Sequence, residues 1–149
     1  MRIITNSASE TRAVGKRLAR LLRGKEILCL FGQLGSGKTT LVKGLAMGLG
    51  VKEAQVSSPS FILMRKYEGR LPLYHFDLYR IKNPREICSI GYEEFIFNGG
   101  VSVIEWADRM EGLLPDSYLR IEFTFLKSNA RLIKFSATTK YYRELIKEL

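Results

Sequence analysis

Residues 32–39 read GQLGSGKT and fit the phosphate-binding pattern G-x-x-x-x-G-K-[ST]. Glycines leave no Cβ in the way, so the backbone can wrap around a phosphate and point the N–H groups of residues 35–37 at its oxygens. Lys38 would meet the β and γ phosphates as a mobile charge, and the Thr39 hydroxyl would bind Mg²⁺. A glycine-rich turn that binds nothing would have no use for Lys38, so we predict a nucleotide site.

The position of this loop strengthens the prediction. Residues 26–31 form a short apolar run that glycine closes, which is typical of a strand buried on both faces of a parallel sheet. After the loop, Leu41, Leu45 and Leu49 recur at helical spacing. The loop therefore lies between a buried strand and a helix, where the helix dipole adds to the attraction for phosphate.

Two acidic residues follow apolar strands and qualify as partners of the bound metal and water. Glu105 ends the apolar run of residues 101–104, and Asp77 ends the less apolar run of residues 73–76. We predict that Glu105 is the metal carboxylate and that Asp77 orders or deprotonates the attacking water. The alternative is that one of them is an ordinary surface acid, because such acids are common at strand ends in α/β proteins.

Adenine is the expected base, because the chain has no Asn-Lys-x-Asp sequence of the kind that selects guanine. A small kinase would be expected to carry an arginine-bearing lid and an acceptor pocket, and no segment between Leu41 and Asp77 indicates either.

For His75 we expect a packed or hydrogen-bonded strand residue rather than a catalytic base. Trp106 either caps the core or anchors a partner. The residues themselves lead to a P-loop ATPase whose substrate is not specified.

The elements that position these residues can be predicted from spacing. Ser7 and Glu10 have the S-x-x-E spacing of a helix start, and a helix is expected over residues 8–23, with Gly24 as its stop. We further expect strands at residues 61–67, 73–77 and 101–104, short helices at 83–89 and 91–97, a hairpin of residues 118–126 and 131–137, and a final helix to Leu149 capped by Thr138 or Thr139.

These elements predict an α/β fold, a P-loop NTPase-like three-layer domain over residues 1–149 with a mixed, partly parallel central sheet. With 149 residues, of which 46% are hydrophobic, the chain can bury a core without disulfides or a structural metal.

The apolar runs of the chain are far shorter than the roughly 18 to 20 residues that span a bilayer, and we see no secretory signal, so we expect a cytoplasmic protein. Cys29 and Cys88 are expected to be reduced, and one histidine cannot complete a Cys/His zinc set.

The basic residues are unevenly placed. Lys and Arg number 24 against 15 Asp and Glu, a net charge of +9 that is concentrated in the first 50 residues. On the first predicted helix, apolar residues share one side, and the opposite side carries a basic stripe of Arg12, Lys16, Arg20 and Arg23. This stripe is either an ordinary solvated face or a surface that meets RNA or an acidic partner.

Several motifs in this order resemble the TsaE (YjeE) ATPase family of bacteria. They are residues 32–40, SPSF at 58–61, HFDLYR at 75–80 and IEW at 104–106, and the similarity covers roughly residues 27–114. The resemblance implies an ATPase that works beside TsaB and TsaD subunits to make threonylcarbamoyl adenosine next to the anticodon of tRNAs. By position it implies phosphate and Mg²⁺ contacts by Lys38, Thr39 and Thr40, a second metal contact by Glu105, a catalytic acid at Asp77, and an adenine border at residues 9–11, Thr11 included.

Two departures from the family pattern matter. Gln33 stands where the family usually has Asp, so we expect slow intrinsic hydrolysis. Ser60 replaces the usual Thr, which keeps a hydroxyl but loses the methyl group that stiffens χ1. Two other functions remain open: a nucleotide-dependent binding module that needs no turnover, and a small P-loop kinase. Contact of the basic stripe with tRNA is also left open.

Overall fold

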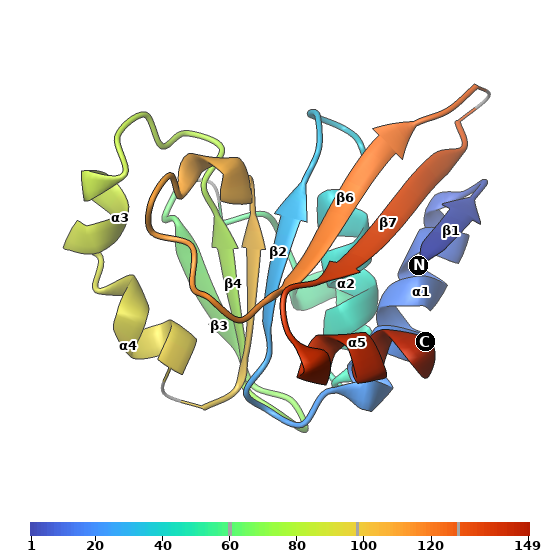
Figure 1. Ribbon diagram of the computed structural model, residues 1–149, viewed down its shortest axis with the longest axis horizontal. Coiled ribbons are helices and arrows are strands. Elements are labelled where there is room, and N and C mark those ends of the chain that lie inside the picture. Colours follow the sequence, from blue (N-terminus) through green and yellow to red (C-terminus); the bar gives the residue numbers. More distant parts are fainter. Residues whose placement is uncertain (60, 98, 128) are drawn as a thin grey trace.

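In the computed structural model, which describes residues 1–59, 61–97, 99–127 and 129–149, the chain folds around a seven-stranded mixed sheet (Figure 1). Ser60, one of the two departures from the family pattern, lies outside the described residues. The strands are β1 (Arg2–Thr5), β2 (Ile27–Phe31), β3 (Met64–Tyr67), β4 (Leu73–Asp77), β5 (Val101–Glu105), β6 (Leu119–Phe125) and β7 (Arg131–Ala137). The helices are α1 (Ala8–Leu21), α2 (Lys38–Gly48), α3 (Arg85–Ser89), α4 (Tyr92–Phe97) and α5 (Lys140–Lys147), with short 3₁₀ turns η1 (Glu53–Gln55) and η2 (Ala107–Arg109).

The sheet has the strand order β1-β7-β6-β2-β5-β4-β3. Its centre is parallel, because β2 pairs in parallel with both β5 and β6, and β4 pairs in parallel with β5. Antiparallel strands complete both sides. The parallel strands β2, β4 and β5 therefore end at one edge of the sheet, the upper edge in Figure 1. In the register, Asp77 pairs with Glu105, and Glu105 pairs with Leu30.

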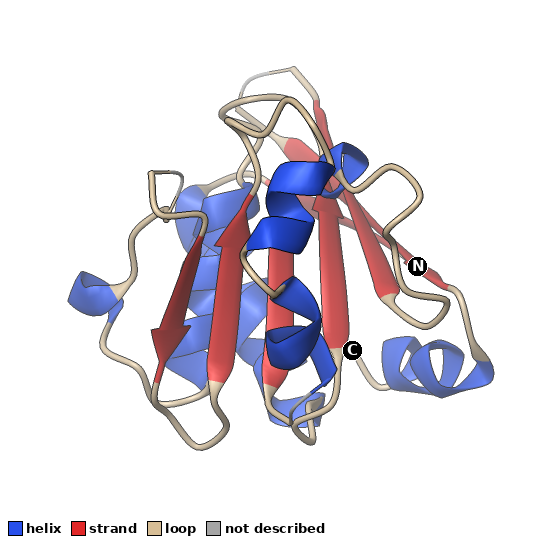
Figure 2. Ribbon diagram, turned by 90° about the vertical axis from the view of Figure 1, so that its left-hand side faces the viewer, coloured by secondary structure: helices blue, strands red, loops and turns tan. Residues whose placement is uncertain are grey.

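Helices cover both faces of the sheet, as Figure 2 shows. Alternation along β2 explains why: Leu28 and Leu30 join the core that α1 and α2 cover, whereas Ile27 and Cys29 join the core under α3 and α4. The predicted fold class, three layers around a mixed and partly parallel sheet, is confirmed. Among the described residues, no helix combines the length and the apolar character needed to cross a membrane.

Helix α1 packs very closely on α2, the helix that follows the phosphate loop. A Cβ added at Gly44 would lie 2.1 Å from the carbonyl oxygen of Arg12, and one added at Gly15 would lie 2.4 Å from that of Leu41. Only glycine permits this approach of the two backbones. The crossing ties the position of α2 to the N-terminal part of the chain.

The ends of α1 show both success and error in the sequence prediction. At its start, the Ser7 hydroxyl accepts the Glu10 N–H at 3.1 Å, and the Glu10 carboxylate accepts the N–H of Asn6 at 2.8 Å, which is a capping box shifted by one residue. The helix ends at Leu21 rather than residue 23. The chain turns away because the Glu26 carboxylate accepts the N–H groups of the next loop, residues 23–25.

Two strands differ from their predictions. β1 was not predicted; it is four residues long and pairs antiparallel with β7. β3 begins at Met64 rather than at residue 61, because Leu63 has a left-handed φ of 65° and the N–H of Ile62 turns back to the carbonyl of Pro59. The other predicted strands, the short helices, the C-terminal hairpin and the final helix are present.

Candidate functional site

The glycine-rich loop joins the end of β2 to the start of α2. Gly32, Gly35 and Gly37 have φ values of 141°, 75° and 106°, which side chains rarely adopt. Gly37 is the N-cap of α2 and has no side chain that could accept a hydrogen bond. The cap therefore provides no acceptor for the backbone N–H groups of the first turn. Such a helix start attracts anions, which suits a phosphate.

Lys38 is the cation of this loop, and its side chain is nearly buried. Its ammonium donates to the carbonyl oxygens of Gly32 at 2.7 Å and Gln33 at 2.9 Å, and it lies 4.0 Å from the centre of the Trp106 ring. Burial lowers the pKa of Lys38 below its usual value, against the opposite pull of Glu105 and nearby aspartates. The Lys38 ammonium is thus bound to backbone carbonyl oxygens, and phosphate oxygens can take their place.

Glu105 lies beside the loop at the end of β5. The Thr39 hydroxyl donates to its Oε2 at 2.8 Å, and the Nε2 atom of His75 lies 2.8 Å from its Oε1. Glu105 is only 2% exposed, so it is not a surface acid. A hydroxyl and a carboxylate in contact present the hard oxygen ligands that Mg²⁺ prefers, so the residues present fit that ion.

Asp77 ends the neighbouring strand and is also nearly buried, at 4% exposure. Its Oδ1 accepts the N–H of Tyr79 at 3.0 Å, and its Oδ2 accepts a short hydrogen bond from the Ser58 hydroxyl. Asp77 is therefore held by the two loops that carry Ser58 and Tyr79, and not by Thr39 or Glu105. The alternative that one of the two acids lies on the surface is wrong.

A cavity of about 350 Å³ lies over these groups. Almost all residues selected from the sequence line it, together with four that were not selected as site residues: Gly35, Ser36, Gly37, Lys38, Thr39, Thr40, Asp77 and Glu105, with Leu34, Ser58, Tyr79 and Trp106. Ser58 and Tyr79 both belong to motifs that the sequence did show, SPSF and HFDLYR, so the signal that could have selected them was present.

Thr11 is the selected residue that the structure does not bring to this cavity. Its side chain is fully buried. The Thr11 hydroxyl bonds to the carbonyl of Ser7 at 3.1 Å and lies 2.9 Å from the hydroxyl of Thr5. In this structure Thr11 links α1 to β1.

The structure also places His75 and Trp106, two further residues considered in the sequence analysis. His75 is fully buried and makes a hydrogen bond, so its prediction as a packed strand residue is confirmed. Trp106 is half-buried and has a left-handed φ of 59°, and its ring centre lies 5.0 Å from that of Tyr79, with the two rings tilted at 46°. It packs against the core under α3 and α4 while its ring also lines the cavity.

The remaining sequence features occupy the surface. Gln33 is exposed, and its backbone carbonyl contributes to the site by accepting from Lys38 and from the N–H of Ser36. In the basic stripe, Lys16, Arg20 and Arg23 are exposed and Arg12 is half-buried.

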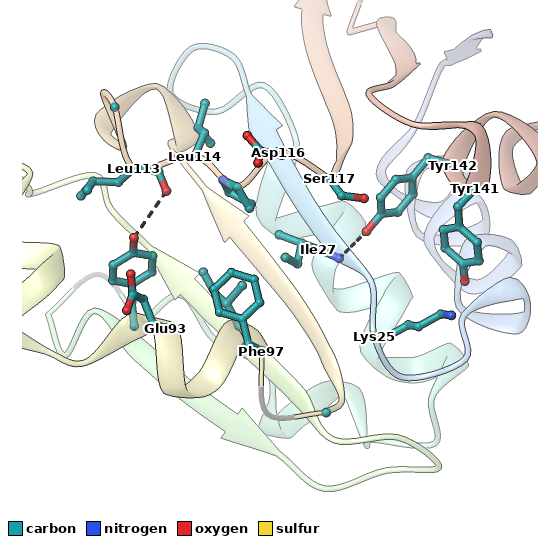
Figure 3. A pocket seen from close by; sticks show the side chains of 15 residues that line it. Lys25, Ile27, Glu93, Phe97, Leu113, Leu114, Asp116, Ser117, Tyr141 and Tyr142 are labelled. Carbon is teal, nitrogen blue, oxygen red and sulfur yellow. Dashed lines mark hydrogen bonds between the residues drawn. The ribbon is translucent and has the colours of Figure 1, made fainter.

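A larger cavity, about 840 Å³, lies at the opposite end of β2 (Figure 3). Lys25, Ile27, α4 and the two tyrosines of α5 line it, and the Tyr142 hydroxyl accepts the N–H of Ile27 at 2.8 Å. Burial raises the pKa of Tyr142 to about 12, so the hydroxyl stays protonated. Ligands of open α/β sheets bind at the carboxyl ends of the strands, which favours the smaller cavity as the functional site.

Comparison with known proteins identifies the family of the chain. A family model described as "Threonylcarbamoyl adenosine biosynthesis protein TsaE" matches residues 5–133. The chain belongs to the TsaE family. A TsaE protein of Treponema pallidum is 41% identical over 133 residues, covering 89% of this chain and 98% of that protein. The TsaE protein of Bacillus subtilis is 38% identical over 146 residues, covering 97% and 90%.

The TsaE fold is also found among solved structures. The crystal structure of Bacillus subtilis YdiB is similar with a TM-score of 0.84 and 33% identity, over 99% of this chain and 92% of that chain. The resemblance seen in the motifs is thereby confirmed.

Proposed function

We propose that the chain is a magnesium-dependent ATPase that serves the threonylcarbamoyl adenosine modification of tRNA. The TsaE relatives are named for biosynthesis of this modification. The observation that carries the proposal is the 2.8 Å contact between Thr39 and Glu105 beside the phosphate loop. It joins an oxygen ligand pair to a loop built for phosphate.

In the proposed reaction, the loop amides and Lys38 bind the β and γ phosphates of ATP. Lys38 leaves the carbonyls of Gly32 and Gln33 and follows the phosphoryl charge. Thr39 and Glu105 would hold Mg²⁺, which neutralises developing charge on the phosphate oxygens when bound. Asp77 orients the attacking water or accepts its proton.

The proposed partners are TsaD-like and TsaB-like subunits of the modifying assembly, and tRNA is a further candidate for the basic stripe. The described helices offer no membrane span. Exposed Lys16, Arg20 and Arg23 give the stripe the charge that RNA or an acidic protein surface would meet.

The test is release of phosphate from ATP by the chain alone and with its TsaB-like and TsaD-like partners. Lys38→Ala should abolish release and tRNA modification, whereas Lys43→Ala on the same helix should keep both. Normal modification in cells carrying Lys38→Ala would overturn the ATPase function. Assembly that needs ATP but no turnover would favour a binding module, and phosphate appearing on a small acceptor would favour a kinase.

A further inference from the structure

His75 is the chain's one histidine and lies in the middle of β4. It pairs in register with the buried Val103 of β5 on one side and with Arg65 of β3 on the other. The side chain is fully buried. Burying an imidazole here costs free energy that burying a valine or isoleucine would not, and the hydrogen bond of the ring must offset that cost.

That hydrogen bond assigns the proton on the ring. Nε2 lies 2.8 Å from Oε1 of Glu105, while Nδ1 is buried without a hydrogen-bond partner among the described residues. A bare Nε2 would place its lone pair against a carboxylate oxygen, and a protonated Nδ1 would leave a buried donor unsatisfied. Nε2 therefore carries the proton and donates it to Glu105.

The two oxygens of Glu105 face different surroundings. Oε2 meets Thr39, which lines the cavity, and Oε1 meets His75, which does not line it. A cation entering from the cavity would reach the Thr39 side of the carboxylate. His75 holds the oxygen on the other side, so the group cannot rotate away from the cavity.

We propose that His75 is a positioning residue that orients Glu105 to receive Mg²⁺. This inference rests on the proposed function and names a residue outside the cavity on which the metal site depends. Groups that hydrogen-bond a metal ligand from behind fix its orientation, and losing one costs about 10- to 100-fold in metal affinity. We expect an effect of this size from loss of the His75 donor.

The experiment measures ADP binding by the fluorescence of Trp106, the chain's one tryptophan, as Mg²⁺ is titrated. ADP avoids any dependence on turnover. His75→Leu, which removes the donor, should raise the half-saturating Mg²⁺ concentration by about 10- to 100-fold and leave ADP affinity without Mg²⁺ unchanged. His75→Gln, whose amide can donate, should recover most of the loss.

A matched control separates positioning from packing. Phe76→Leu alters the adjacent buried residue, which faces the other core. It should lower thermal stability without moving the Mg²⁺ dependence. If His75→Leu binds ADP with the wild-type Mg²⁺ dependence, or loses affinity equally with and without Mg²⁺, the inference is overturned and the proposed ATPase is not.

A measurement on the wild-type chain covers the case in which His75→Leu fails to fold. Because there is one histidine, its ring nitrogens give an unambiguous ¹⁵N NMR signal. We expect a proton on Nε2, and a larger shift of this signal with ADP and Mg²⁺ than with ADP alone. A proton on Nδ1 with a bare Nε2 would overturn the inference. ADP binding by the wild type that ignores Mg²⁺ would remove the metal site and the inference together.

Discussion

Glu26 and Glu105 are buried at opposite ends of two neighbouring parallel strands, and their surroundings differ. Glu26 directly precedes β2, and its carboxylate accepts three backbone N–H groups, from Arg23 at 3.0 Å, Gly24 at 2.9 Å and Lys25 at 3.0 Å. The Tyr141 hydroxyl makes a fourth, short bond. Glu105 ends β5, accepts from Thr39 and His75, and borders the cavity over the phosphate loop.

The difference shows that burial of a carboxylate does not by itself indicate function. Burial acts to raise the pKa of Glu26, but the bonds from Tyr141 and the three amides outweigh it and hold that pKa below its ordinary value. All of these partners belong to the fold, so Glu26 stabilises a loop. Glu105 has fewer partners and one side toward a cavity, which leaves it able to bind a cation.

The largest effect is expected at the phosphate-loop end of the sheet, where Asp77 and Glu105 should have separate roles. Asp77→Asn should lower the rate of phosphate release by about 10² to 10⁴, because acid–base help is lost, while ADP binding stays near wild type. Stopped assays of phosphate release and ADP titrations measure the two. Asp116→Asn, an exposed acid at the other end of the sheet, is the control. Loss of ADP binding in Asp77→Asn would show that this acid, too, serves binding.

Glu105→Ala should raise the Mg²⁺ concentration needed for nucleotide binding by about 100-fold, at least as much as loss of an outer hydrogen-bond partner costs. Its melting temperature should also fall, since the buried Nε2 of His75 loses its acceptor. Nucleotide fluorescence over a Mg²⁺ series decides this. If Asp77→Asn shifts the Mg²⁺ dependence and Glu105→Ala does not, the two roles are reversed.

Glu26→Gln, unlike Glu105→Ala, should affect stability alone. Hydrogen bonds to a charged group contribute about 1.5 to 3 kcal/mol, so we expect the free energy of unfolding to fall by about 2 kcal/mol. Nucleotide binding should be unchanged. Urea unfolding measures the loss, and Glu93→Gln, an exposed acid on α4, should stay within about 0.5 kcal/mol of wild type. A weakened nucleotide site would break the contrast between the two ends.

The contribution of Glu26 should also depend on pH. Because its pKa in the folded chain lies below the ordinary 4.5, the stabilisation is complete above about pH 4.5 and disappears as pH falls through the folded value. The difference in unfolding free energy between wild type and Glu26→Gln should therefore shrink between pH 7 and pH 3. A constant difference over this range would mean that the charge of Glu26 contributes nothing.

The smallest effect is expected from charges that belong to neither end. Reversing Lys16, Arg20 and Arg23 to Glu should leave stability and nucleotide binding unchanged and weaken assembly with an acidic partner several-fold, with the loss removed by high salt. Reversal of Lys82 and Arg85, near α3, is the control. Unchanged assembly at low salt would leave the stripe as an ordinary solvated face.

Features that depend on neighbouring residues could be predicted from the sequence. The phosphate loop, the acids Asp77 and Glu105 and the cap at Ser7 each follow from a short pattern. Contacts that depend on register could not be predicted: His75 meets Glu105 across 30 positions only because β4 and β5 pair as they do. β1 was missed because four residues carry too little periodicity, and only the edge offered by β7 makes them a strand.

The contact between Gly44 and the backbone of Arg12 also has a mechanical consequence. With no side chain between them, α1 and α2 cannot slide past each other without a backbone collision. α2 starts at Lys38, inside the phosphate loop, and α1 carries Arg12, Lys16 and Arg20 of the basic stripe, of which Lys16 and Arg20 are exposed. The close packing of the two backbones therefore couples the position of the helix that starts in the phosphate loop to that of the helix that carries most of the stripe.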